Sequence, residues 1–263
     1  MKPVALITGA SAGIGTELAR VFARHGHELV LSARREDRLK ALADEIAEPG
    51  KPRPTVLALD LEKRDAVSSL AGELSSRGLE PQFVVNNAGF GLSGAAAALS
   101  LDEQLAMIDL NVRTLTELSL RFVDSLARHR GGILNVASIA AFLPGPGMAV
   151  YYASKAFVLS FSEALHHELA DRGIRVTALC PGPVETEFQA RSGMKLPQAA
   201  KLITLPPGRV AEIGYDALMR GQRVAIAGAG NKIAVALMRF VPHALLLHAI
   251  GRQAKRDRIA PTI

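Results

Sequence analysis

The chain has 263 residues, of which 49% are hydrophobic and 21% are charged, and its formal net charge is +6. This composition supplies one α/β domain with enough aliphatic side chains for a core, and it excludes a disordered or fibrous protein. The single cysteine, Cys180, excludes an intrachain disulfide and a zinc cage built on cysteines.

Short apolar runs alternate with helical patterns from the first residues onward. The runs are rich in Val, Ile and Leu, as expected of strands buried on both faces, and lie at 4–7, 28–32, 55–59, 83–85, 133–136, 174–179 and 223–227. Helical apolar spacing is found at 14–26, 39–46, 101–129 and 153–172. This alternation predicts right-handed βαβ crossovers and a parallel sheet that is covered by helices on both faces.

A glycine-rich turn, Thr8-Gly9-Ala10-Ser11-Ala12-Gly13-Ile14-Gly15, follows the first strand and opens the first helix. Its glycines allow a sharp turn and a close approach to a pyrophosphate, while the helix N-terminus offers free N–H groups to the anion. The stricter Gly-x-Gly-x-x-Gly pattern is not met, because Leu18 stands where its last glycine would be. A purely structural turn is the alternative.

The end of the second strand reads Ser32-Ala33-Arg34-Arg35, where NAD-specific folds carry an acid for the ribose hydroxyls. Without that carboxylate, a 2′-phosphate can lie against Arg34, with Arg35 as a helper. The motif therefore indicates NADP(H). The alternative is a solvated basic start to the next helix.

Tyr151 and Lys155 are four residues apart in a helical pattern, so they share one face of the helix. A neighbouring ammonium favours the phenolate, so Tyr151 can give or take a proton at a substrate oxygen while a hydride moves at carbon. Ser138, at the end of a strand, is placed to hydrogen-bond the same oxygen. Tyr152 lies three residues from the lysine and has no such partner.

Together these motifs resemble the short-chain dehydrogenase/reductase family over nearly the whole chain, in its NADP-preferring branch. The matching residues are Thr8-Gly9-x-x-x-Gly13-x-Gly15, Asp60, Asn86-Asn87-Ala88-Gly89, Asn111, Ser138, Tyr151, Lys155 and Pro181-Gly182-Pro183-Val184-x-Thr186. The resemblance implies a Rossmann-type, doubly wound sheet of about seven parallel strands. It also implies hydride transfer between the nicotinamide and a carbonyl or alcohol.

The resemblance further implies residue roles, with Asn111, Ser138, Tyr151 and Lys155 as the catalytic group. Lys155 would also bind the nicotinamide ribose, Asn111 would hold a water that relays protons, and Thr186 would touch the carboxamide. The residues expected to bind the cofactor are Gly9, Ser11, Ala12, Gly13, Ile14, Gly15, Arg34, Arg35, Asp60, Leu61, Asn87, Ala88, Gly89, Tyr151, Lys155, Pro181, Gly182, Val184 and Thr186. No metal site is expected. A homodimer or homotetramer through 101–129 and 153–172 is expected by analogy alone.

Apolar residues beside these motifs predict a hydrophobic carbonyl or alcohol as the substrate. They are Phe90, Phe142, Leu143, Met148, Phe188, Met194 and Leu196, each with ordinary core packing as the alternative. Arg191 and Lys195, in the expected substrate loop 184–207, either meet a substrate carboxylate or phosphate or are solvated loop charges.

Three functions are compatible with these residues. The first is an NADPH-dependent carbonyl reductase, and the second is an alcohol dehydrogenase that works mainly in the oxidative direction. The third is an NAD(P)-sensing regulatory or binding protein that kept the fold and lost the chemistry. The intact residues Asn111, Ser138, Tyr151 and Lys155 argue against the third.

Residues 229–263 form a basic extension beyond the catalytic domain expected at 1–228. From Arg220 onward, eight Lys and Arg residues accompany one acid, so this end carries +7 and the remaining 219 residues carry −1. A nucleic-acid partner would favour a basic stripe on the folded body, so none is expected. Docking on its own domain, weak contact with a membrane surface, an oligomer contact and a lid over a long substrate all stay open.

The apolar stretches also bear on location. None of them reaches, uninterrupted, the ~18 residues that a membrane-spanning helix needs, and the N-terminal run is too short for a signal peptide. We expect a cytoplasmic protein that is at most peripheral at a membrane surface.

Overall fold

The computed structural model describes residues 1–263 except 48–49, 194–202, 239, 243–244, 248–249 and 253–263. Within the described residues, one sheet contains β1 (Lys2–Thr8), β2 (Leu29–Ala33), β3 (Thr55–Ala58), β4 (Leu79–Asn86), β5 (Gly132–Val136), β6 (Arg175–Cys180) and β7 (Val224–Ile226). All neighbours pair in parallel, in the order β3-β2-β1-β4-β5-β6-β7. The doubly wound sheet of about seven strands is confirmed, and each predicted strand overlaps an observed one.

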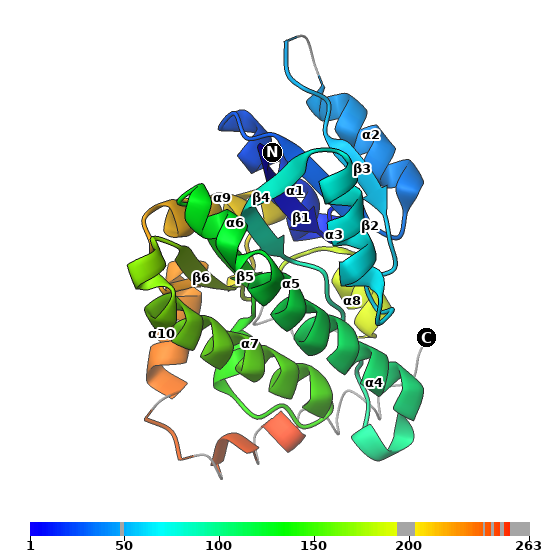
Figure 1. The fold of residues 1–263 in the computed structure, drawn as a ribbon. Helices are drawn as coiled ribbons and strands as arrows, with labels where there is room; N and C mark the ends of the chain where they lie inside the picture. The colour runs from blue at the N-terminus through cyan, green and yellow to red at the C-terminus, as the bar shows by residue number, and fades with distance from the viewer. Residues whose placement is uncertain (48–49, 194–202, 239, 243–244, 248–249, 253–263) are drawn as a thin grey trace.

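Helices cover both faces of this sheet (Figure 1). One layer contains α1 (Gly13–Arg24), α2 (Glu36–Ile46) and α9 (Pro207–Met219). The other contains α3 (Ala66–Ser76), α4 (Leu101–Ile108), α5 (Leu115–Arg121), α6 (Val123–Arg128) and α7 (Ala149–Glu168). The remaining described elements are α8 (Glu187–Ser192), α10 (Ala229–Met238) and the short turns η1 (Ala96–Ala98), η2 (Asp109–Thr114), η3 (Ile139–Phe142) and η4 (Ala170–Arg172).

The strand order reverses between β1 and β4, and hydrogen bonds join the ends of these two strands. The Thr8 hydroxyl donates to the Val85 carbonyl at 3.1 Å and accepts from the backbone N–H groups of Asn87 and Ala88, also at 3.1 Å. The Asn87 amide donates to the carbonyls of Thr8 and Gly9 at 3.0 and 3.2 Å. In open α/β sheets a crevice forms at such a switch point, which places the candidate site here.

The segment 101–129 was predicted as one long helical pattern, and the structure corrects this. A π-helical turn, η2, separates α4 from α5, and a further break at Phe122 separates α5 from α6. Asn111 lies in the π turn, where its side chain binds the backbone of Phe90. The insertion of one residue into a helix changes the apolar periodicity too little to be read from sequence.

The helices α4, α5 and α7 carry several exposed large apolar side chains. Leu101, Leu105 and Ile108 of α4, Leu120 of α5 and Phe157 of α7 are all exposed. These residues lie in the segments 101–129 and 153–172, through which self-association is expected from the sequence. A homodimer or homotetramer stays a prediction.

The first part of the C-terminal extension packs on the catalytic domain. In α10 the Asn231 side chain is buried and donates to the carbonyls of Ala227 and Ile203 at 2.7 and 3.1 Å. Val235 is buried beside it, whereas Ile233 and Leu237 are about 60% exposed. None of the described helices is long and apolar enough to cross a membrane. Contact with a membrane surface stays a prediction, and four of the eight basic residues counted from Arg220 onward lie outside the described residues.

Gly15 allows α1 to approach the joined ends of β1 and β4. A Cβ at this position would lie 2.2 Å from the Gly9 carbonyl oxygen and 2.4 Å from the Asn87 amide nitrogen. We predict that Gly15→Ala lowers the free energy of unfolding by about 1–3 kcal/mol, the usual cost of overpacking. Urea unfolding followed by circular dichroism measures the change.

The matched control is Gly72→Ala in α3, where a new Cβ meets no described atom within 4 Å. This exposed helical glycine should gain about 0.5–1 kcal/mol when replaced by alanine. Equal effects of the two substitutions would contradict the tight packing inferred at Gly15.

Candidate active site

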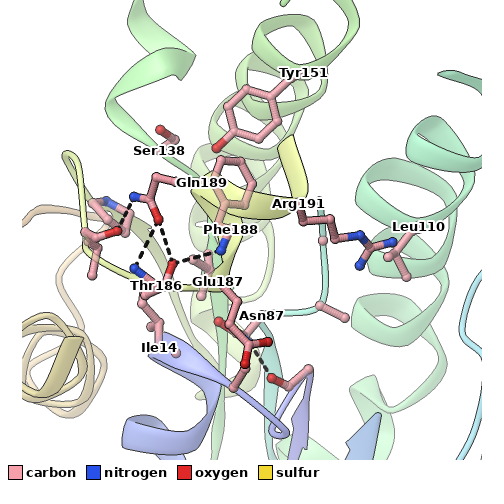
Figure 2. Close-up of a pocket in the computed structure, with 18 of the residues that line it drawn as sticks. Ile14, Asn87, Leu110, Ser138, Tyr151, Thr186, Glu187, Phe188, Gln189 and Arg191 are labelled. Carbon is pink, nitrogen blue, oxygen red and sulfur yellow. Dashed lines mark hydrogen bonds between the residues drawn. The ribbon is translucent and has the colours of Figure 1, made fainter. Parts of the chain in front are cut away.

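A cavity of about 820 Å³ opens at the carboxyl ends of the strands, and Figure 2 shows part of its wall. All of the residues predicted to bind the cofactor line it except Gly15, which packs behind the wall. Ser138, Tyr151 and Lys155 line it as well, whereas Asn111 is buried. The structure therefore brings the two predicted halves of the site, the glycine turn and the catalytic group, into one space.

The glycine turn fits a pyrophosphate. Gly9 and Gly13 have left-handed φ angles of 65° and 57°, which favour glycine. The α1 N-cap, Ala12, provides no side-chain cap among the described residues, so the first N–H groups of the helix remain available to an anion. A Cβ at Gly13 would lie 3.0 Å from the Thr186 side chain, so the glycine also allows the nicotinamide-side loop to approach.

Three arginines, which we call the basic cluster, line the cavity near the glycine turn: Arg34, Arg35 and Arg38. Arg34 pairs with Glu62 at 3.1 Å, and Arg35 donates to the Ser11 hydroxyl at 3.3 Å. A cluster of guanidinium groups next to a helix N-terminus suits a nucleotide with an additional phosphate. Sequence reasoning missed Arg38, although its spacing from Arg34 on a helical pattern was the available signal.

Tyr151 and Ser138 meet at the other end of the cavity. Both side chains line the cavity, and the Tyr151 ring packs 5.4 Å from the ring of Phe188 on α8. Burial raises the pKa of Tyr151 to about 12, whereas the nearby Ser138 hydroxyl acts in the opposite direction. The phenol is therefore protonated at neutral pH.

Lys155 lies one helical turn from Tyr151 on α7, as the sequence predicted. Its ammonium donates to the Val136 carbonyl at 2.7 Å and lies 5.9 Å from the centre of the Tyr151 ring. Burial lowers the pKa of Lys155 to about 8. Burial thus acts on both groups in the direction that favours their neutral forms.

Asn111 is behind the cavity wall rather than at its surface. Its amide oxygen accepts from the Phe90 N–H at 3.1 Å, and its amide nitrogen donates to the Phe90 carbonyl at 2.9 Å and to the Ser154 hydroxyl at 3.1 Å. Both amide hydrogens are thus used within the protein. The side chain thus fixes the backbone of the loop that follows β4, next to Tyr151.

Apolar residues line the end of the cavity near Tyr151, although not all of the residues predicted there reach it. Leu143, Met148 and Phe188 line the cavity. Phe90 is buried beneath the wall, and Phe142 packs in a separate cluster. The other predicted residues here, Met194, Lys195 and Leu196, lie outside the described residues.

The lining residues that were assigned no role in the sequence include Tyr152 and Gln189. Arg191, for which a contact with a substrate anion and a solvated loop charge were both left open, also lines the cavity. Its guanidinium lies 4.4 Å from the centre of the Phe90 ring and 3.5 Å from Glu62.

Comparison with protein families identifies the same motifs. A family model described as short chain dehydrogenase matches residues 3–196. The chain is 39% identical over 191 residues to sulfoacetaldehyde reductase 2 of Chromohalobacter salexigens, covering 72% of this chain and 75% of the relative. It is 36% identical over 190 residues to the NADP-dependent 3-hydroxy acid dehydrogenase YdfG of Salmonella typhi, covering 71% and 75%.

The fold is also similar to solved structures. A short-chain dehydrogenase from Sphingobium yanoikuyae in complex with NADPH superposes with a TM-score of 0.78 and 31% sequence identity. The match covers 92% of this chain and 97% of that one. The similarity therefore extends beyond the nucleotide-binding motifs to almost the whole domain.

Proposed function

Since the chain belongs to the short-chain dehydrogenase/reductase family, we propose that it is an NADPH-dependent reductase of hydrophobic carbonyl compounds, with Tyr151 as the proton donor. NADP(H) as the cofactor agrees with the NADP-dependent relative and with the NADPH complex. One observation carries the proposal: the Tyr151 phenol and Ser138 share a single cavity with the basic cluster.

The chain's own groups would hold the cofactor along the cavity. The N–H groups at the start of α1 would bind the pyrophosphate, and Arg34 and Arg35 the 2′-phosphate. Lys155 and Thr186 would hold the nicotinamide end. Bound NADPH supplies the hydride.

Ser138 and Tyr151 would bind the substrate carbonyl oxygen from one side. Because the pKa of Tyr151 is raised to about 12, the phenol keeps its proton until charge develops on that oxygen. Ser138 would stabilise the same charge by donating a hydrogen bond. The Lys155 ammonium would lower the cost of the phenolate that is left after proton transfer.

Asn111 would act as a positioning residue. Its amide holds both backbone groups of Phe90, next to Gly91, where a Cβ would lie 3.1 Å from the Tyr151 ring. The water expected at Asn111 would then have to be held by its backbone, because both side-chain hydrogens are used. The π turn around Asn111 departs from regular helical bonding, which suits such a role.

Leu143, Met148 and Phe188 favour a hydrophobic substrate. A short carbonyl compound with an anionic group is the second candidate, favoured by relatives that are named for sulfoacetaldehyde and for 3-hydroxy acids. Arg191 gives this second class little support, since its guanidinium is paired with Glu62.

Removing the Tyr151 hydroxyl tests the proposed proton donor. We predict that Tyr151→Phe lowers kcat for carbonyl reduction by about 10²–10⁴-fold, the usual contribution of general acid catalysis. The dissociation constant of NADPH, measured by its fluorescence, should change by less than about threefold, because the aromatic ring of residue 151 remains. Steady-state NADPH oxidation measures kcat.

Tyr152→Phe is the matched control, because Tyr152 is the adjacent phenol and also lines the cavity. Its kcat should stay close to that of the unmodified protein. If Tyr151→Phe kept full turnover, or if both variants lost it equally, Tyr151 would not be the proton donor.

The pH dependence tests the role of Lys155. Its pKa is lowered to about 8, so the ammonium is present below pH 8 and is lost as the pH rises through that value. The Tyr151 phenol, with a pKa of about 12, stays protonated over the same range. We predict that kcat/KM for reduction is level below pH 8 and falls above it, in stopped-flow or steady-state assays.

Lys155→Arg provides the control, because a guanidinium stays charged throughout this range. Whatever activity this variant retains should show no decline between pH 8 and pH 10. A level profile for the unmodified protein up to pH 10, with circular dichroism showing it still folded, would contradict the role of the ammonium.

A further inference from the structure

Glu187, the first residue of α8, binds two arginines of the basic cluster from across the cavity mouth. One carboxylate oxygen accepts from Arg35 at 2.7 Å, and the other accepts from Arg38. The partners are 152 and 149 residues apart in sequence, so these contacts join the start of α2 to the start of α8. All three residues line the cavity.

The arginines bound by Glu187 face the same space as the glycine turn. Arg35 also donates to the Ser11 hydroxyl, which lies between Gly9 and Gly13. Arg34 is engaged separately, by Glu62 at 3.1 Å. Glu187 is therefore the carboxylate that binds Arg35 and Arg38. Hydrogen bonds lower its pKa, and the bond from Arg38 has a larger effect than the bond from Arg35.

A carboxylate held by two guanidinium groups uses the chemistry by which arginines bind a phosphate monoester. A phosphate offers three acceptor oxygens and more negative charge than a carboxylate. The side chains of Arg35, Arg38 and Glu187 are 40%, 46% and 52% exposed. Ion pairs exposed to this degree are weak, so a stronger anion can replace the carboxylate.

We propose that Glu187 competes with the cofactor's 2′-phosphate for Arg35 and Arg38, and that Arg38 completes the phosphate site. The inference rests on the assignment of the basic cluster to the 2′-phosphate under the proposed function. NADPH must displace Glu187 to engage both arginines, whereas NADH, which has no 2′-phosphate, leaves the pairs in place. Glu187 thus limits the preference for NADPH over NADH.

Two nucleotide fragments test the competition without turnover. Isothermal titration of the full chain at low salt compares adenosine 2′,5′-bisphosphate with 5′-AMP, which differ by the 2′-phosphate. In Glu187→Gln the dissociation constant of the bisphosphate should fall by about three- to tenfold, as expected for the loss of two exposed competing ion pairs. That of 5′-AMP should change by less than about twofold, because 5′-AMP does not need the two arginines.

Glu185→Gln is the matched control. It removes the same charge two residues away, and Glu185 is exposed and forms no ion pair with the residues that the structure describes. Both dissociation constants should stay unchanged in this variant. Arg38→Gln should weaken the bisphosphate alone, and in that background Glu187→Gln should have a smaller effect, as coupled residues do in a double-mutant cycle.

Three results would overturn the proposal. If Glu187→Gln weakened the binding of both fragments equally, Glu187 would help to hold the bound nucleotide rather than compete with it. Identical behaviour of Glu187→Gln and Glu185→Gln would show that the pairing has no effect on binding. If the unmodified protein bound neither fragment, the cofactor assignment would fail together with this inference. If it bound the bisphosphate with the same affinity in the presence and absence of the Glu187 carboxylate, only this inference would fail.

Discussion

The hydrogen bonds of Thr8 and Asn87 join the end of β1 to the end of β4, and the site is built around this junction. The strand order reverses here, so the connections that leave β1 and β4 diverge and form a crevice. Gly15 allows α1 to start close to the junction, which directs the helix N-terminus at the crevice. A longer side chain at that position would separate the helix from the strands.

The two ends of the cavity differ in their exposure to water, and their ionisable side chains therefore behave differently. The basic cluster is exposed, so its ion pairs can exchange one anion for another. Tyr151 and Lys155 are buried, so their pKa values shift in opposite directions, each toward the neutral form. The short helix α8 contacts both ends, since Glu187 reaches the arginines and the adjacent Phe188 packs against Tyr151.

The strands, the glycine turn and the catalytic side chains could be predicted because each depends on a short stretch of sequence. Apolar runs define buried strands, and a spacing of four residues puts Tyr151 and Lys155 on one face of α7. The π turn at Asn111 was not predictable, because one inserted residue hardly alters the helical pattern. The pairing of Glu187 with Arg38 joins residues that only the folded sheet brings together, and no local spacing encodes it.

The measurement that tests the account most directly is NADPH oxidation by the full chain against two series of carbonyl compounds. One series is ketones of increasing apolar length, and the other is short carbonyl compounds that carry a carboxylate or sulfonate. A substrate seated against Leu143, Met148 and Phe188 predicts that kcat/KM rises with apolar length and is higher with NADPH than with NADH. Turnover confined to the short anionic compounds, or NADPH binding without turnover of either series, would contradict it.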